Sequence, residues 1–309
     1  MRRERGRAAA GRGPRAKKSL GQNFLVDQQV VDGIMEALDV RPGDRVLEIG
    51  PGHGVLTRRL VQEGAEVVAV ELDLDLISEL ETLPIQVIHG DILKVDVGAV
   101  FGERGQGLGG RGQPRRPAPN LTHPALSARQ PYKVIGNIPY YISSPLLRHV
   151  LEAQPRPESV VLMLQEELAE RVVAKPGSMS LLSVSVQLYG RPEIVLRVPA
   201  KAFRPAPKVD SAVVRIEVYP EPLIPMANPE HFFAVARAGF AERRKQLHNA
   251  LQRNWKPAGA HTRAALDPAA VVETLQSVGI DPARRAETLT LREWALVAEQ
   301  LAPSGRLGA

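Results

Sequence analysis

The stretch Gly136 to Ser144, Gly-Asn-Ile-Pro-Tyr-Tyr-Ile-Ser-Ser, contains the residue types needed for chemistry on the amine of a nucleobase. The exocyclic amine of adenine or cytosine is a poor nucleophile because its lone pair is delocalised into the ring. Two acceptors, the Asn137 side-chain oxygen and the Ile138 carbonyl, can hold the amine hydrogens and turn the lone pair towards an electrophile. Tyr140 would then stack on the base, an interaction worth roughly 1–3 kcal/mol.

Pro139 and a preceding apolar run restrict how this stretch folds. Pro139 has a fixed φ and no N–H, and it biases Ile138 towards an extended conformation. The run Tyr132 to Ile135 predicts a buried strand that ends where the motif begins. Because ligands bind at the carboxyl ends of strands in open α/β sheets, this position favours a functional site. The alternative is a structural junction, with Asn137 capping local backbone and Tyr140 packed in the core.

A second candidate site follows the strand predicted over residues 46–49. The sequence from Glu48 to Gly54 reads Glu-Ile-Gly-Pro-Gly-His-Gly. Glycines such as Gly50 and Gly52 allow the backbone to approach a ligand closely at the edge of a sheet. This spacing predicts a nucleotide-like ligand at the end of the first strand.

Glu71 ends the next predicted strand, over residues 67–70, and lies 21 positions beyond Gly50. An acid at that place binds ribose hydroxyls. A dinucleotide site would need a small residue at position 55, which is Val, and no Gly-Lys-Ser/Thr sequence is present to form a P-loop. The pattern favours a ligand without a pyrophosphate, S-adenosylmethionine, over a dinucleotide.

Two further residues are candidates for contacts to a nucleobase. Asp91 follows the strand predicted over 85–88, where its carboxylate could accept from an adenine amine; the alternative is a turn or helix-cap Asp. Phe203 begins a loop, residues 203–211, that is stiffened by two prolines. We predict that Phe203 offers a second face to a flipped base, and the alternative is that it plugs the edge of the core.

Composition limits the function classes. The 309 residues are long enough for two domains, and 44% of them are hydrophobic. The absence of cysteine excludes disulfides, thiolate zinc sites and cysteine nucleophiles. The seven histidines lack ligand spacing, so no metal is expected. No apolar run approaches the ~18 residues that span a bilayer, and the N-terminus lacks a signal-peptide core. We expect a cytoplasmic monomer without membrane contact.

The net charge of +6 is concentrated in two segments. Residues 1–18 carry a net +7 and residues 98–131 a net +4, which leaves −5 for the remainder. A polyanion partner is therefore plausible although the folded body is not uniformly basic. The alternative is that both segments are only soluble disordered chain.

The order of predicted elements indicates an α/β fold. Residues 1–18 are expected to be a basic disordered arm, and residues 19–219 a Rossmann-like domain interrupted by a Gly/Pro/Arg-rich insertion at 98–131. The remaining predicted elements of this domain are helices over 28–38, 55–61, 74–80, 144–151, 165–173 and 180–188, the last of which could also be a strand, and strands over 159–164, 193–198 and 211–218.

Residues 220–309 are predicted to form a smaller all-α C-terminal domain after a proline-rich linker. One helix is expected from Pro229 through Asn254, another from Pro268, and a third after the capping box Thr290 to Glu293. The first helix is expected to carry four basic residues that could contact RNA phosphates, although a solvated helix face is the alternative. These residues are Arg237, Arg243, Arg244 and Lys245.

From about residue 17 to 301, apart from the insertion, the chain resembles the KsgA/RsmA family of ribosomal RNA small subunit adenine dimethyltransferases. The motifs that carry the resemblance are Gly21-Gln-Asn-Phe-Leu25, Glu48 to Gly54, Asn137 to Pro145, Phe203 to Ser211 and Arg243-Arg-Lys-Gln-Leu-His-Asn249. The insertion at 98–131 departs from the family pattern.

The resemblance implies a Rossmann-like methyltransferase that uses S-adenosyl-L-methionine to dimethylate two adjacent adenosines near the 3′ end of 16S rRNA in the small ribosomal subunit. It implies cofactor contacts at Asn23, Leu25, Gly50, Glu71, Asp91 and Asn137, and target-base contacts at Asn137, Tyr140 and Phe203. From the residues themselves, Gly52 is added to the cofactor contacts, and Ile138 and Pro139 are added to the catalytic residues. Two rivals stay open: an Erm-type enzyme acting on 23S rRNA, and a non-catalytic ribosome-assembly or transcription factor on the same fold.

Overall fold

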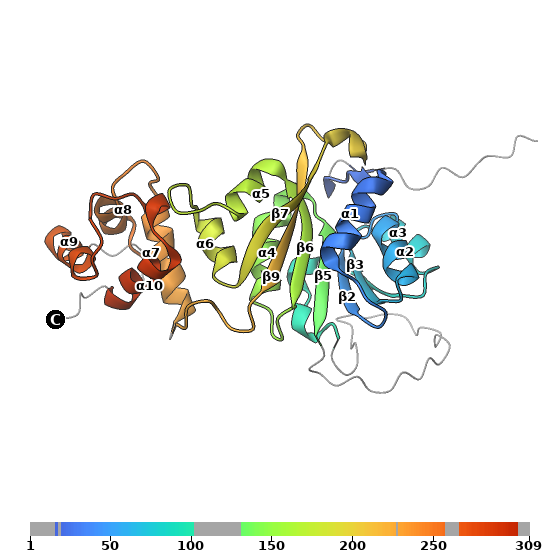
Figure 1. Cartoon of the computed structure of the whole chain (residues 1–309), viewed down its shortest axis with the longest axis horizontal. Helices are drawn as coiled ribbons and strands as arrows, with labels where there is room; N and C mark the ends of the chain where they lie inside the picture. Colours follow the sequence, from blue (N-terminus) through green and yellow to red (C-terminus); the bar gives the residue numbers. More distant parts are fainter. Residues whose placement is uncertain (1–15, 18–19, 102–130, 227, 257–265, 302–309) are drawn as a thin grey trace, which may run out of the picture.

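A seven-stranded sheet forms the centre of the described part of the chain (Figure 1), in the order β4-β3-β2-β5-β6-β9-β7. The computed structural model describes residues 16–17, 20–101, 131–226, 228–256 and 266–301. The first five strands in that order are parallel, and β9 is antiparallel to both β6 and β7. Their bounds are β2 Arg45–Ile49, β3 Glu66–Glu71, β4 Gln86–His89, β5 Tyr132–Asn137, β6 Ser159–Gln165, β7 Gly190–Val198 and β9 Ser211–Val218.

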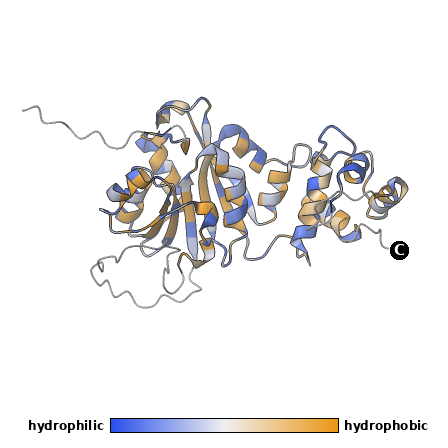
Figure 2. Cartoon of the chain, turned by 180° about the vertical axis from the view of Figure 1, so that it is seen from behind, coloured by the Kyte–Doolittle hydropathy of each residue, from blue (hydrophilic) through white to orange (hydrophobic). Residues whose placement is uncertain are grey.

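Helices cover both faces of this sheet, as the Rossmann-like prediction requires. Successive strand residues point to opposite faces, so Val46, Ile135 and Val161 pack with α1 and α2, whereas Leu47 and Val134 pack with α4 and α6. Figure 2 shows hydrophobic residues concentrated along these strands. The helices are α1 Gln28–Leu38, α2 Val55–Gln62, α3 Leu74–Leu80, α4 Ser143–Leu151, α5 Glu166–Val172 and α6 Leu181–Gln187.

A short second sheet pairs two segments that are distant in sequence. β1 (Phe24–Leu25) is antiparallel to β8 (Phe203–Arg204), with Leu25 opposite Phe203. Local periodicity does not predict strands of two residues. The pairing holds the N-terminal segment across the carboxyl edge of the large sheet.

The C-terminal region is helical, as predicted, and lies at one end of the elongated molecule (Figure 1). Its core holds Trp255, Trp294 and Phe232, each at most 1% exposed. This core is continuous with the one between the sheet and α4. No helix in the described ranges is long and apolar enough to cross a membrane. The helices are α7 Pro229–Phe240, α8 Leu247–Asn254, α9 Pro268–Ser277 and α10 Leu291–Gln300.

The prediction of one helix from Pro229 through Asn254 is wrong, because the chain turns at residues 241–246. This stretch, Ala-Glu-Arg-Arg-Lys-Gln, has no large apolar residue to bury. The turn allows α8 to fold back on α7 and to bury Leu247 completely, so tertiary packing overrides local helix propensity. The predicted capping box of Thr290 and Glu293 at the start of α10 is confirmed.

Most of the predicted arm, apart from residues 16–17, and most of the predicted insertion lie outside the described residues, but both ends of segment 102–130 are placed. Arg45, the first residue of β2, donates to the Phe101 carbonyl at 2.6 Å and lies opposite Tyr132 in the sheet. The Phe101 and Tyr132 rings are 5.4 Å apart. Both ends therefore meet at the amino edge of the sheet, roughly 17 Å along β5 from Asn137 at 3.3 Å per residue.

We expect deletion of residues 104–129 to leave the thermal unfolding midpoint and the affinity for S-adenosylmethionine unchanged. The reason is that the two flanks are already close together, at the edge opposite the predicted site. Thermal unfolding and calorimetric titration measure both quantities, and a large fall in cofactor affinity would contradict the expectation. The same variant tests the segment as an RNA contact, since losing its arginines should flatten the salt dependence of RNA binding.

Candidate functional site

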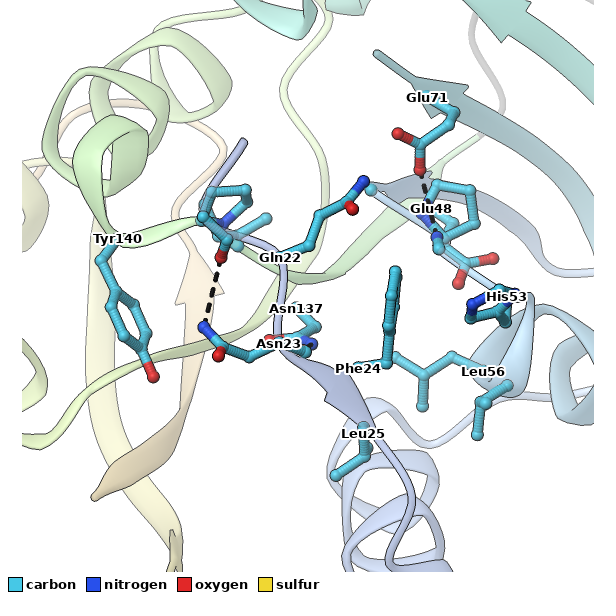
Figure 3. Close-up of a pocket in the computed structure, with 17 residues that line it drawn as sticks. Gln22, Asn23, Phe24, Leu25, Glu48, His53, Leu56, Glu71, Asn137 and Tyr140 are labelled. Atoms are coloured by element: carbon cyan, nitrogen blue, oxygen red, sulfur yellow. Dashed lines mark hydrogen bonds between the residues drawn. The ribbon is translucent and has the colours of Figure 1, made fainter. Parts of the chain in front are cut away.

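A cavity lies at the carboxyl ends of β2, β3 and β5, the edge at which open α/β sheets bind ligands. It is lined by residues 21–25, by most of residues 48–56, by Glu71 and by residues 137–140. Figure 3 shows Asn137 and Tyr140 on one side of Phe24, and Glu48, His53 and Glu71 on the other. The two sites predicted from sequence are thus halves of one cavity.

The glycine loop after β2 holds the Glu71 carboxylate in place. Gly50 and Gly52 adopt φ values of 65° and 59°, a region that side chains other than glycine rarely enter. The Gly52 N–H donates to one Glu71 oxygen at 3.1 Å, and the Asp73 N–H donates to the other at 2.8 Å. Burial raises the pKa of Glu71, and these backbone donors oppose the rise.

Glu48 lines the cavity beside this loop, and sequence reasoning did not select it as a site residue. It is 1% exposed, and its Oε2 atom has no hydrogen-bond partner among the described residues. Burial raises its pKa to about 7, with a further contribution from the negative charge of Glu71. The sequence did contain a signal for Glu48, namely an acidic residue inside the apolar strand β2. A buried carboxylate costs free energy unless a partner compensates it.

Residues 21–25, which we call the strap, cross the cavity between its two halves. The Phe24 ring lies 4.4 Å from the His53 ring and packs against Gly52. On the other side, the Asn137 Nδ2 atom donates to the Asn23 carbonyl at 2.9 Å. This bond fixes which way the Asn137 amide points. Its Oδ1 atom is therefore the one available as an acceptor.

Tyr140 follows Asn137 on the wall of the cavity. Its hydroxyl forms a hydrogen bond of 3.2 Å with Ser211 of β9, which is fully buried. Burial raises the pKa of Tyr140, and the Ser211 bond lowers it in part. The phenol consequently stays protonated at neutral pH, and the anchored hydroxyl sets the position of the ring. The neighbouring Tyr141 is 61% exposed.

Nine of the eleven residues predicted for the cofactor or the target base line this cavity. They are Asn23, Leu25, Gly50, Gly52, Glu71, Asn137, Ile138, Pro139 and Tyr140. Asp91 is placed at the carboxyl end of β4 as expected, but outside the cavity lining, and it caps the short helix Ile92–Lys94 by accepting from Leu93 N–H at 3.1 Å. Its contact with the cofactor stays a prediction.

Phe203 does not line the cavity, so its stacking on the base stays a prediction. The side chain is 1% exposed and packs in the core beneath α1, with Met163 and Val213 among its cluster. Its partner across the β1·β8 pair is Leu25. Phe203 is buried because this pairing turns its ring inward, the alternative that the sequence left open.

The four basic residues predicted to contact RNA lie in the helical domain, away from the cavity. Arg237 is on α7, and burial together with the charge of Arg148 lowers its pKa. Arg243, Arg244 and Lys245 are exposed, but they occupy the turn between α7 and α8 and not a helix face as predicted. Their RNA contact stays a prediction.

Comparisons with known proteins agree on one family. A family model described as ribosomal RNA adenine dimethylase matches residues 13–290. "Ribosomal RNA small subunit methyltransferase A" of Dehalococcoides mccartyi is 40% identical over 92% of this chain and 87% of its own length. The protein of the same name from Alkaliphilus metalliredigens is 38% identical over 93% of this chain and 92% of its own.

Solved structures show the same fold. The 23S rRNA methyltransferase ErmE is 26% identical, with a TM-score of 0.60 over 90% of this chain and 98% of its own. A dimethyladenosine transferase from Plasmodium falciparum has a TM-score of 0.67 and 24% identity over 90% of this chain and 97% of its own.

We expect Glu48→Gln to stabilise the chain at alkaline pH. A Glu whose pKa rises from 4.5 to about 7 on folding binds its proton more tightly in the folded state, so stability falls as pH rises from 4.5 through 7. The side-chain amide of the Glu48→Gln variant does not ionise, so the variant keeps this stability. Its free energy of unfolding at pH 8 should be higher than that of the wild type by about 3 kcal/mol. Urea unfolding at pH 8 and pH 4 measures it. The gain should vanish at pH 4, and an equal gain at both pH values would contradict the titration of Glu48.

Proposed function

The chain belongs to the family of ribosomal RNA adenine dimethylases, and we propose that it transfers methyl groups from S-adenosyl-L-methionine to the exocyclic amines of two adjacent adenosines near the 3′ end of 16S rRNA. The product would be dimethyladenosine, formed during biogenesis of the small subunit. The observation that carries the proposal is the hydrogen bond from Asn137 to the Asn23 carbonyl, which leaves Oδ1 as an acceptor in the cavity.

The cavity residues fit this cofactor. The two Glu71 oxygens are fixed by backbone donors, and each keeps acceptor capacity for a ribose hydroxyl. The Glu48 Oε2 atom, buried without a partner among the described residues, suits the cationic methionine end of the molecule. When bound, S-adenosylmethionine supplies a methyl group on a sulfonium, which is already a strong electrophile.

The residues on the other side of the strap position the amine. Asn137 Oδ1 and the Ile138 carbonyl accept its hydrogens and so free the lone pair, while the Tyr140 ring stacks on the base. Flipping the adenine out of its stack in the RNA costs a few kcal/mol. Stacking of the flipped base on Tyr140 offsets roughly 1–3 kcal/mol of this cost. Catalysis here consists mainly of orientation. Tyr140 stays protonated and does not act as a base. None is needed, because the alkylated amine is acidic enough to release its proton to water.

The small ribosomal subunit is the preferred source of the RNA. The names of the two bacterial relatives point to it, whereas the likeness to a 23S rRNA methyltransferase keeps the large-subunit RNA as the second candidate. We expect the chain to act as a cytoplasmic monomer, with Arg237, Arg243, Arg244 and Lys245 contacting phosphates. A non-catalytic assembly factor is disfavoured because the cofactor half and the acceptor half of the cavity are both complete.

The deciding experiment supplies labelled S-adenosylmethionine to undermethylated small subunits and, separately, to large-subunit RNA. Modified nucleotides are then mapped by reverse-transcription stops. The proposal expects two adjacent stops near the 3′ end of 16S rRNA and no stop in 23S rRNA. Modification confined to 23S rRNA would support the second candidate, and no label in either RNA would support the assembly factor.

We expect Asn137→Ala to lower turnover by at least ~10²-fold, the usual scale for removal of one oriented polar group from a transition state. Cofactor binding should persist in weakened form, as calorimetry would show. Asn137→Asp is the matched variant: it keeps an acceptor but cannot donate to Asn23, and its charge opposes that carbonyl. It too should lose most turnover. Near wild-type methylation by the Ala variant would contradict the assignment.

Tyr140→Ala should lose more activity than Tyr140→Phe, because stacking depends on the ring. The Phe variant loses the bond to Ser211 and should show a smaller fall. Initial methylation rates at saturating cofactor compare the two variants. Equal losses would argue that the hydroxyl, and not the ring, is what matters.

A further inference from the structure

The strap is attached to the cofactor half of the cavity by three polar side chains, which we call the clamp: Lys17, Gln22 and Asp73. Lys17 Nζ lies 2.5 Å from Asp73 Oδ1, and Gln22 Nε2 donates to Asp73 Oδ2 at 2.8 Å. The Lys17 N–H in turn donates to Gln22 Oε1 at 2.7 Å. The clamp therefore joins the chain before the strap, the strap itself and the start of α3.

Asp73 is the buried centre of the clamp. Its side chain is only 2% exposed, whereas that of Lys17 is 38% exposed. Burial alone would raise the pKa of Asp73, but the hydrogen bonds from Lys17 and Gln22 outweigh this effect and lower it. Asp73 is therefore ionised at neutral pH, and each carboxylate oxygen accepts from one partner in the clamp.

Asp73 also contacts the ribose-binding candidate directly. Its backbone N–H donates to Glu71 Oε1 at 2.8 Å, and its side chain caps α3 by accepting from Asp75 N–H at 3.1 Å. A continuous set of contacts thus runs from Glu71 through Asp73 to Gln22. The next residue in the strap is Asn23, whose carbonyl holds the Asn137 amide.

We propose that Asp73 is a positioning residue for methyl transfer, holding the strap through Lys17 and Gln22 so that the Asn23 carbonyl orients Asn137. The clamp then couples the two halves of the cavity, so that cofactor bound at Glu71 strengthens RNA binding at Asn137. This inference rests on the proposed function for the identity of the two ligands. Its structural part, the dependence of the strap on Asp73, does not.

The physical basis of the coupling is that one segment serves both ligands. A ligand that contacts the strap reduces its freedom, and a second ligand that needs the same arrangement then loses less conformational entropy on binding. Such coupling must be reciprocal, and typical values are about 5- to 150-fold in affinity. Without the clamp, the strap is still paired to β8 and Phe24 still packs against Gly52, but Gln22 loses its hydrogen bond to Asp73.

The test compares Asp73→Asn with Asp75→Asn. Asparagine is also a good helix cap, so the first change removes the charge that binds Lys17 while keeping α3. Asp75 lies 2.7 Å from the same lysine, but it is 60% exposed, and the Gln22 amide donates to Asp73. RNA affinity is measured with and without S-adenosyl-L-homocysteine, which binds but cannot react.

For the wild type and Asp75→Asn, we expect S-adenosyl-L-homocysteine to raise RNA affinity at least fivefold. For Asp73→Asn, the ratio of the RNA affinities with and without S-adenosyl-L-homocysteine should fall to within twofold of one. The fold-decrease in turnover should exceed the fold-increase in the KM for cofactor. A ratio unchanged by Asp73→Asn, or equally reduced by Asp75→Asn, would overturn the proposal.

Hydrogen exchange of the ligand-free chain gives a readout that does not depend on activity. The Val26 N–H, just after the strap, donates to the Ala202 carbonyl at 2.9 Å. Asp73→Asn should speed exchange of this amide at least tenfold while amides of β2 and β5 stay protected. If Asp73→Asn does not fold, Gln22→Ala takes its place, with the same results expected. Exchange unchanged in a folded variant contradicts the clamp, whereas failure of the wild type to methylate RNA contradicts the proposed function alone.

Discussion

The hydrogen bond between the Asn137 amide and the Asn23 carbonyl is the contact on which the rest of the site depends. An asparagine side chain can present either its oxygen or its nitrogen, and only the oxygen accepts from an amine. The backbone carbonyl removes this ambiguity because it can only accept. The orientation of one amide is thereby set by a segment 114 residues away in sequence.

The fold serves this contact by bringing distant segments to one sheet edge. Parallel strands β2, β3 and β5 all end there, so the glycine loop, Glu71 and Asn137 meet without any of them being close in sequence. The two-residue pair of β1 and β8 then holds the strap across that edge. The flanks of segment 102–130 join at the opposite edge, beside Arg45, so this large segment is inserted where it leaves the strand ends intact.

Sequence patterns placed Asn137, Tyr140 and Glu71 at one sheet edge, where they line the same cavity, because each lies at or just after the end of a buried strand and strand ends converge in an α/β sheet. They left open whether Phe203 is buried in the core, since a two-residue strand has no period from which its inward face could be read. They also joined α7 and α8 into one helix, because the turn at 241–246 is dictated by burial of Leu247 and not by a local breaker. The acid inside the apolar strand β2 could have drawn attention to Glu48, but the sequence does not show that its Oε2 atom lacks a partner among the described residues or that Lys17 contacts Asp73, since both arise from tertiary packing.

The most direct measurement of the central claim is a crystal structure of the chain with S-adenosyl-L-homocysteine and an RNA fragment containing the two adenosines. The account predicts that Asn137 Nδ2 still donates to the Asn23 carbonyl while Oδ1 lies within hydrogen-bond distance of the adenine amine, with the base stacked on Tyr140. An Asn137 amide turned away from Asn23, with its Oδ1 atom out of reach of that amine, would contradict it.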